Sequence, residues 1–169
     1  MLHSHYSIQI LTAARPGGVR FCSWSEIDYE RKIWTIPANR TKAKITKKHM
    51  VPLPEQAIAI LKSIPKIGDF IFIIKGDRPI SDRTVKALVE RMHKQQKSID
   101  GVGYIDINQD NRLIVPHGFR STFKDWSVEN TDYQDVVTEL ALSHVNSDKA
   151  RAAYARSQLI DKRCPLMND

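Results

Sequence analysis

Residues 116–123 read Pro-His-Gly-Phe-Arg-Ser-Thr-Phe, and this stretch places His117 and Arg120 three positions apart. Side chains at i and i+3 lie on one face of a helix, so this pair can hold one anion jointly. The spacing of the residues that follow predicts a helix from His117 to Glu129. A His-x-x-Arg pair is frequent by chance, so a surface pair near a helix start remains an alternative on these residues alone.

Hydrophobic periodicity predicts further helices on both sides of this stretch. Downstream, helices are expected at 133–144 and 147–156, with a short closing helix after them. Upstream, they are expected at 2–14, ending near Pro16, at 17–23, after Pro54, and after Ser81, which is a typical N-cap residue. The helix after Ser81 has an apolar face made of Val85, Leu88, Val89 and Met92.

Three short segments have the composition of strands. Residues 31–37 and 47–53 flank a basic turn at 41–46 and predict an antiparallel hairpin, and residues 70–74 resemble a buried strand. Residues 98–116 are rich in Gly, Asn and Asp and predict a long loop. The expected fold is therefore mainly α with a small antiparallel β-sheet (α+β), in a single domain over residues 1–169.

The charge balance favours a polyanionic partner. The chain has 26 basic and 19 acidic residues, a net charge of +7 and a pI near 9.5, which points to nucleic acid. Charge alone also fits small basic proteins that bind nothing in particular. No apolar run approaches the ~20 residues that span a bilayer, and no secretory signal is present, so we expect a cytoplasmic protein. Cys22 and Cys164 match no metal-ligand spacing.

Four further sequence features accompany the His117–Arg120 pair. They are Leu11-Thr-Ala-Ala-Arg-Pro-Gly17, the Thr41-Lys42 hairpin leading to Met50-Val-Pro-Leu53, Leu142-Ser-His144, and Tyr154, ten residues after His144. In this order and spacing they resemble the tyrosine recombinases, and most closely the prophage integrases. The resemblance runs over nearly the whole chain and includes Trp24-Ser-Glu-Ile-Asp28.

The resemblance assigns a role to each of these residues. It implies that Arg15 and Arg120 bind the scissile phosphate and that Lys42 protonates the departing 5′ oxygen. His117 and His144 would complete the set of side chains around that phosphate. Tyr154 would be the nucleophile that forms a 3′-phosphotyrosyl bond. The broken bond's energy stays in that intermediate, so no cofactor, metal or ATP is expected.

Physical chemistry is consistent with these roles. A phosphodiester under attack gathers negative charge on its non-bridging oxygens, and arginine offers them a fixed, always charged pair of donors. His117 is a plausible general acid/base and His144 a phosphate donor. A tyrosine hydroxyl has a pKa of about 10, and nearby cations would stabilise its phenolate.

Each assignment has a structural alternative. Arg15 could cap a helix end, and His144 could stabilise the end of a helix whose other residues resemble core. Tyr154 lies in Ala152-Ala-Tyr-Ala155, small residues that suit either close approach of DNA or helix packing. Lys44, Lys47 and Lys48 compete with Lys42 for the role of general acid, and these three lysines are expected to contact DNA.

Position 18 departs from the family pattern, because Gly18 stands where a glutamate that orients its neighbours usually follows the first arginine. This change leaves open a decayed integrase that acts only as a DNA-binding module. Two different enzyme classes also fit parts of the pattern. One is a type IB topoisomerase-like enzyme, and the second is a metal-dependent nuclease that uses His117 and His144.

The resemblance also implies partners. They are double-stranded DNA attachment sites, a recombinase tetramer in the full-length protein, and possible host DNA-bending and excisionase proteins; no membrane is involved. The N-terminal core-binding and arm-binding domains of such integrases are expected to be absent from this chain, so it should bind DNA weakly.

Overall fold

A computed structural model describes residues 2–40, 48–74, 76–107, 109–144 and 158–169. Its helices are α1 (Leu2–Thr12), α2 (Pro16–Arg20), α3 (Glu55–Ser63), α4 (Asp82–Asp100), α5 (Gly118–Asn130), α6 (Asp135–Ala141) and α8 (Ile160–Asn168). Its strands are β1 (Ile27–Asp28), β2 (Ile33–Ile36), β3 (His49–Pro52), β4 (Ile105–Asp106) and β5 (Arg112–Leu113), with 3-10 turns η1 (Trp24–Glu26) and η2 (Ala38–Arg40). The mainly helical fold with small antiparallel sheets is as predicted.

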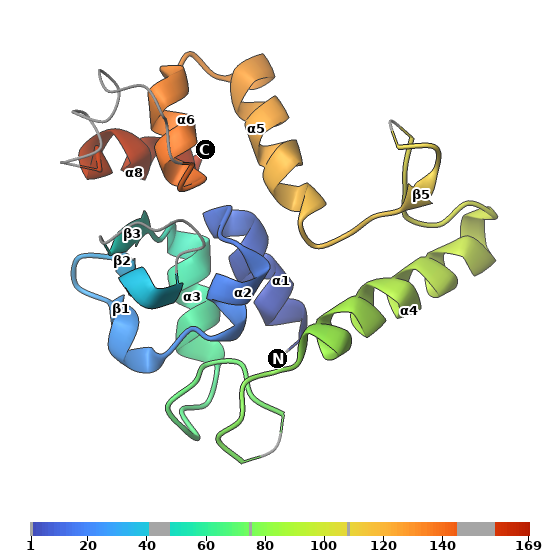
Figure 1. Cartoon of the computed structure of the whole chain (residues 1–169), viewed down its shortest axis with the longest axis horizontal. Helices are drawn as coiled ribbons and strands as arrows, with labels where there is room; N and C mark the ends of the chain where they lie inside the picture. Colours follow the sequence, from blue (N-terminus) through green and yellow to red (C-terminus); the bar gives the residue numbers. More distant parts are fainter. Residues whose placement is uncertain (1, 41–47, 75, 108, 145–157) are drawn as a thin grey trace.

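Two apolar clusters organise these elements. The larger one joins α1, α3, the first half of α4 and the three-stranded sheet around fully buried side chains such as Trp34 and Phe72. The smaller one lies among α5, α6 and α8 and includes Val137, Ala141 and Leu166. Figure 1 shows these three helices as a group beside α1, α2 and the sheet, while α4 extends away from both. The candidate site lies where the two groups meet.

The three-stranded sheet has the order β1-β2-β3, and both pairings are antiparallel. The predicted hairpin of residues 31–37 and 47–53 is confirmed, with Trp34 opposite Val51 and Ile36 opposite His49. Side chains alternate between the two faces of a strand, so His49 shares a face with the buried Val51. The turn at 41–46 lies outside the described residues.

Two sequence-based expectations were wrong. Residues 70–74 form no strand; they make only isolated bridges, between Ser23 and Phe70 and between Ile73 and Pro79. Ile71, Phe72 and Ile73 are buried without a neighbouring strand that continues the pairing, whereas Ile74 is exposed. Residues 98–116 are not one long loop, because α4 continues to Asp100, where Gly101 ends it at φ +75°, and β4 then pairs with β5.

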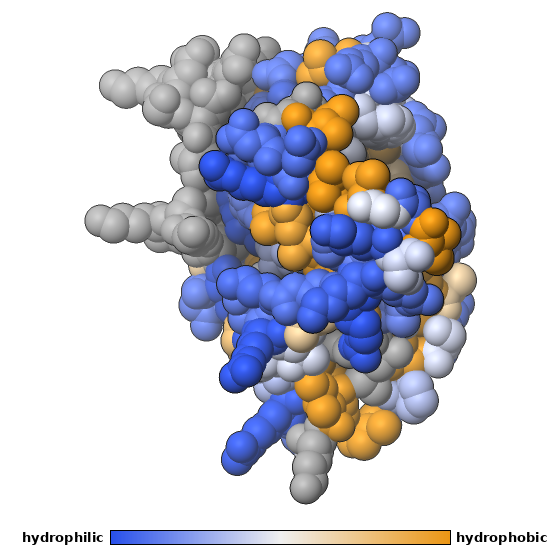
Figure 2. All heavy atoms as spheres, turned by 90° about the vertical axis from the view of Figure 1, so that its right-hand side faces the viewer, coloured by the Kyte–Doolittle hydropathy of each residue, from blue (hydrophilic) through white to orange (hydrophobic). Residues whose placement is uncertain are grey.

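The expected capping of α4 is confirmed, because the Ser81 hydroxyl accepts the Thr84 amide at 3.1 Å. Figure 2 faces the side of the molecule from which α4 and the β4–β5 hairpin project, and it shows hydrophilic side chains interleaved with apolar ones. The exposed basic residues of α4 include Lys86, Arg91, Lys94 and Lys97. Among the described helices, none combines the length and the apolar character needed to cross a bilayer.

Candidate active site

Arg15 stands at the junction between α1 and α2. Its backbone is extended, as the residue before a proline requires, and Pro16 begins α2. The half-buried guanidinium donates a hydrogen bond from Nη2 to the Ser143 carbonyl at 3.0 Å. Burial lowers the pKa of Arg15. Arg15 is therefore fixed to the end of α6, which is 128 residues away in sequence.

Arg120 enters the same region from the first turn of α5 and is only 4% exposed. Its Nη1 donates to the Ala13 carbonyl, and its Nη2 donates to the Leu142 carbonyl. Nη2 also lies 3.3 Å from Nε2 of His144. Burial, and then the charge of Arg15, lower the pKa of Arg120 to about 10. Arg120 therefore links α1, α5 and the end of α6.

Two carbonyls that accept bonds from these arginines belong to residues in the left-handed backbone region. Ala13 has φ +48° and Ser143 has φ +52°. This conformation costs a residue with a Cβ roughly 1–2 kcal/mol, and such costs often occur at functional sites. At both positions the chain turns just after a helix, and the turn directs its carbonyl to a guanidinium. Backbone oxygens, rather than a carboxylate at position 18, thus orient the arginines.

His144 follows α6 and contacts Arg120 on one side and Glu139 on the other. Its Nδ1 lies 2.9 Å from Oε2 of Glu139, and Lys124 Nζ lies 2.8 Å from Oε1 of the same carboxylate. Burial raises the pKa of Glu139, but hydrogen bonds from Lys124 and His144 outweigh it and leave this pKa below its usual value. His144 is exposed and held at both ring nitrogens, which a helix-end role alone does not require.

A narrow cleft opens beside the two arginines. The residues that line it are Ala14, Arg15, Gly18, Ile36, Arg40, His49, Arg120 and Ser143. Arg40 forms an ion pair with Glu26 and donates to the Phe21 carbonyl, so its positive charge is neutralised by that carboxylate. Arg15 and Arg120 are thus the arginines that can hold an anion such as a phosphate here.

Sequence reasoning missed His49, which enters this cleft from β3. Burial, and then the charges of Arg163, Arg15 and Arg120, lower its pKa to about 3, against a hydrogen bond with the Ala141 backbone that raises it. His49 is therefore neutral near pH 7. Its position two residues before Val51, on the buried face of a strand, is the sequence signal that could have indicated it.

The other predicted residues are not all gathered at this cleft. His117 is the exposed N-cap residue of α5, one turn before Arg120, whose amide donates to the His117 carbonyl at 3.1 Å. It does not line the cleft as the described residues define it. Lys42, Lys44, Lys47, Tyr154 and the helix expected at 147–156 lie outside the described residues.

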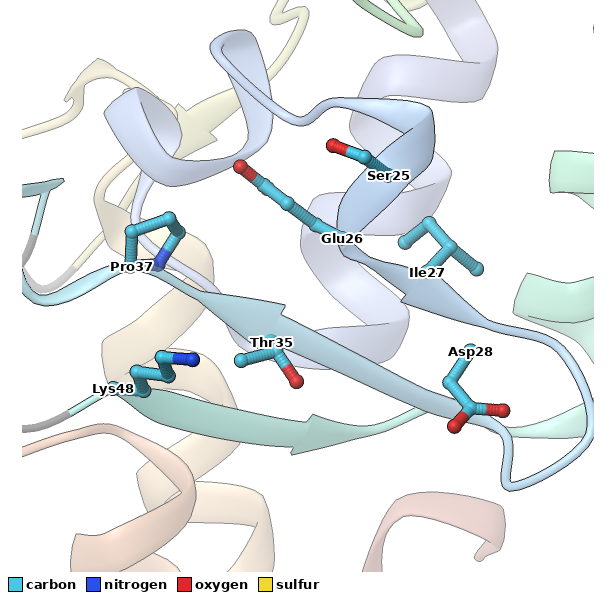
Figure 3. A pocket seen from close by; sticks show the side chains of 7 residues that line it. All are labelled: Ser25, Glu26, Ile27, Asp28, Thr35, Pro37 and Lys48. Carbon is cyan, nitrogen blue, oxygen red and sulfur yellow. The ribbon is translucent and has the colours of Figure 1, made fainter.

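Lys48 lies elsewhere, in an open hollow beside the three-stranded sheet. Figure 3 shows its side chain beside Thr35 of β2, with Glu26 across the strand. The Glu26 carboxylate accepts from Trp34 Nε1 at 3.0 Å and pairs with Arg40. The hollow's main acidic group is therefore structural, and Lys48 does not join the two arginines within the described part of the chain.

Comparison with known proteins agrees with this geometry. The fold is that of tyrosine recombinase catalytic domains. The chain belongs to the phage integrase family, whose profile matches residues 3–159. It is 33% identical to prophage integrase IntA of Escherichia coli K12 over 164 residues, which cover 94% of this chain and 35% of that protein. The integrase of Enterobacteria phage P4 is 28% identical over 95% of this chain and 37% of its own length. The chain thus spans about a third of these relatives.

Solved structures support the fold independently. The Tn1549 transposon integrase in complex with a circular intermediate DNA superposes with a TM-score of 0.63 at 13% identity. The match covers 91% of this chain and 58% of that one. The backbone arrangement is therefore shared even where few side chains are.

Proposed function

We propose that this protein cuts and rejoins DNA at specific sites, in the integration and excision of a prophage, through a 3′-phosphotyrosyl bond to Tyr154. One observation carries the proposal. Arg15 and Arg120, 105 positions apart in the sequence, line one cleft and are each fixed by backbone carbonyls at the end of α6. Two fixed guanidiniums are suited to the charge that develops on a phosphodiester under attack.

The remaining roles extend from this pair of arginines. His144, in contact with Arg120, donates to a phosphate oxygen, and His117 transfers a proton at one of the bridging oxygens. Lys42 protonates the departing 5′ oxygen, and Lys44, Lys47 and Lys48 contact the DNA backbone. Because the phosphotyrosyl bond keeps the energy of the bond that was broken, the reaction requires no metal or ATP.

The described residue Gln158 is anchored beside the hairpin that leads to the proposed site. Gln158, four residues after Tyr154, accepts the Met50 amide at 2.8 Å and donates to the Lys48 carbonyl at 2.9 Å. This side chain therefore holds Gln158 against β3, the strand that carries His49.

Gly18 does not remove the support of the arginines. A Cβ built on Gly18 would meet Ile36 Cδ1 at 3.6 Å and Trp34 Cη2 at 3.8 Å, which are ordinary contacts. The arginines keep their carbonyl partners regardless of this position. We therefore favour an active enzyme over a decayed integrase that only binds DNA.

The wider assembly is also part of the proposal. The Tn1549 relative was solved in complex with DNA, and the +7 charge of this chain suits a double-stranded DNA partner. We propose that the chain serves as the catalytic domain of a recombinase tetramer on two attachment sites in the cytoplasm. A host DNA-bending protein and an excisionase would set the direction of recombination.

A covalent-trapping assay tests the proposal. The protein and its Tyr154→Phe variant are incubated in chelator with a pool of nicked duplexes of random sequence, and adducts are sought on a denaturing gel. A Tyr133→Phe variant is the matched control, because the Tyr133 hydroxyl is bonded to Asp169 at 2.8 Å. We expect an adduct in the parent and in the control, and none in Tyr154→Phe.

Each competing function has its own outcome. DNA binding without any adduct would indicate a binding module, and cleavage that stops in chelator would indicate a metal-dependent nuclease. Plasmid relaxation without strand exchange would indicate a topoisomerase-like enzyme. Any of these results would overturn the proposed recombination.

A further inference from the structure

A continuous chain of polar contacts leads from α5 through α6 and back to Arg120. Lys124 Nζ lies 2.8 Å from Glu139 Oε1, and Glu139 Oε2 lies 2.9 Å from His144 Nδ1. His144 Nε2 lies 3.3 Å from Arg120 Nη2. The proposed reaction gives roles to Arg120 and His144 but none to Glu139, the carboxylate between the lysine and the histidine.

The partners of His144 select one tautomer of the neutral ring in the empty site. An arginine N–H can only donate, so Nε2 of His144 accepts from Arg120 and carries no proton. An ionised carboxylate can only accept, so Nδ1 of His144 carries the proton and donates it to Glu139. The resting histidine is therefore the neutral Nδ1–H tautomer, with its Nε2 lone pair directed to Arg120.

This arrangement is the wrong one for binding phosphate. To donate to a phosphate oxygen, Nε2 must carry a proton. The neutral Nε2–H tautomer would leave the bare Nδ1 facing the Glu139 carboxylate, which puts two acceptors 2.9 Å apart. His144 can therefore become a donor only by taking up a second proton, which the negative charge of Glu139 stabilises.

The other charged and titratable groups around His144 set when this happens. Arg120 on α5 and Arg15, which binds the neighbouring Ser143 carbonyl, both oppose a positive charge on the ring. Lys124 lies beyond Glu139 on α5. His49 of β3, whose pKa is about 3, stays neutral near pH 7. An anion between the two arginines would offset their repulsion, so protonation should follow the arrival of phosphate.

We propose that Glu139 is a positioning residue, which holds His144 as the Nδ1–H acceptor in the empty site and makes its conversion to a phosphate donor depend on proton uptake. This inference rests on the proposed function, because it assumes that His144 contacts the scissile phosphate. It adds a carboxylate that supports the site from α6, and a coupling between phosphate binding and protonation.

The test compares Glu139→Gln with two controls over a range of pH. Glutamine keeps the shape but accepts or donates at Nδ1, so it permits both neutral tautomers. Lys124→Gln removes the ion pair between α5 and α6 while leaving the Glu139–His144 contact. Glu129→Gln changes an exposed carboxylate at the end of α5. The readouts are the initial rate of adduct formation and the imidazole ¹⁵N shifts of His144 with and without sulfate.

We expect the Glu139→Gln rate to be about tenfold below the parent at the acidic end of the range and to approach the parental rate at the basic end. Glu129→Gln should keep a ratio to the parent that does not change with pH, and Lys124→Gln should keep the direction of the parent's pH dependence because the Glu139–His144 contact remains. Bound sulfate should favour uptake of a proton from solvent at Nε2 of His144 in the parent. In Glu139→Gln the empty site should contain both tautomers.

Failure of this inference differs from failure of the proposed function. If adducts form but the ratio of the Glu139→Gln rate to the parental rate is constant with pH, Glu139 is only structural. That result would refute the inference and leave the proposed function supported. If sulfate leaves Nε2 of His144 unprotonated, the coupling is likewise refuted. If no adduct forms in the parent at any pH, the proposed function itself is contradicted.

Discussion

Replacement of Arg120 by methionine tests both the architecture and the chemistry of the site. Methionine keeps the unbranched stem but loses the bonds to the Ala13 and Leu142 carbonyls and to His144. Hydrogen bonds to a charged donor contribute about 1.5–3 kcal/mol each, so losing the two carbonyl bonds costs about 3–6 kcal/mol.

Part of this cost is offset, because the variant no longer buries a charge. Burial is the main reason that the pKa of Arg120 falls from its ordinary value to about 10, and a shift of this size corresponds to a penalty of about 3 kcal/mol. Taking about 4.5 kcal/mol, the middle of the range for the two carbonyl bonds, the net loss expected for Arg120→Met is therefore about 1.5 kcal/mol in the free energy of unfolding. Loss of a donor to the reacting phosphate should also slow adduct formation by about 10²-fold or more.

Urea unfolding followed by circular dichroism measures the first quantity, and the trapping assay measures the second. Arg91→Met on the exposed face of α4 is the matched control and should change stability by less than about 0.5 kcal/mol. If Arg120→Met is as stable as this control, Arg120 does not tie α1 to the end of α6. If it still forms adducts at the parental rate, Arg120 does not bind the phosphate.

Two further predictions concern stability. His5 is fully buried with no hydrogen-bond partner for either ring nitrogen among the described residues, and burial, followed by the charge of Arg20, lowers its pKa to about 4. His5 of the unfolded chain binds a proton at a higher pH than His5 of the folded chain, so the free energy of unfolding decreases as pH falls from about 6.5 to 4. In urea unfolding, His5→Phe should lose about 2–3 kcal/mol less over that range. Parallel pH curves for the variant and the parent would contradict this. Ser143→Gly should raise the free energy of unfolding by about 0.5–1 kcal/mol because Ser143 has φ +52°, whereas Ser121→Gly within α5 should lower it; a loss at position 143 would show that the left-handed turn is not strained.

Local signals in the sequence were sufficient for the elements that depend on them. Ser81 caps α4 through its own hydroxyl, and alternation along residues 47–53 gives the face of β3 that packs inward. The segment 70–74 failed because its apolar, β-branched composition reports burial equally well whether or not a partner strand exists. Its burial was real, but pairing depends on distant residues that composition cannot reveal.

In the candidate site too, some residues could be predicted from the sequence and others depend on tertiary packing. Arg15 and Arg120 could be predicted from the order of motifs, and the structure brings them to one cleft. Glu139 could not be predicted, because it lies five residues before His144. Two residues at that spacing do not lie on the same face of a regular helix. The contact arises because α6 ends at Ala141 and the chain turns through a left-handed Ser143.

The most direct test of the central claim is to identify the residue that becomes attached to DNA. Trapped adducts are digested with nuclease and protease, and tandem mass spectrometry locates the nucleotide remnant on the peptide. The account predicts a 3′-linked nucleotide on Tyr154 and on no other tyrosine. A remnant on Tyr6, Tyr29, Tyr104 or Tyr133, or cleaved DNA with no linked peptide, would contradict it.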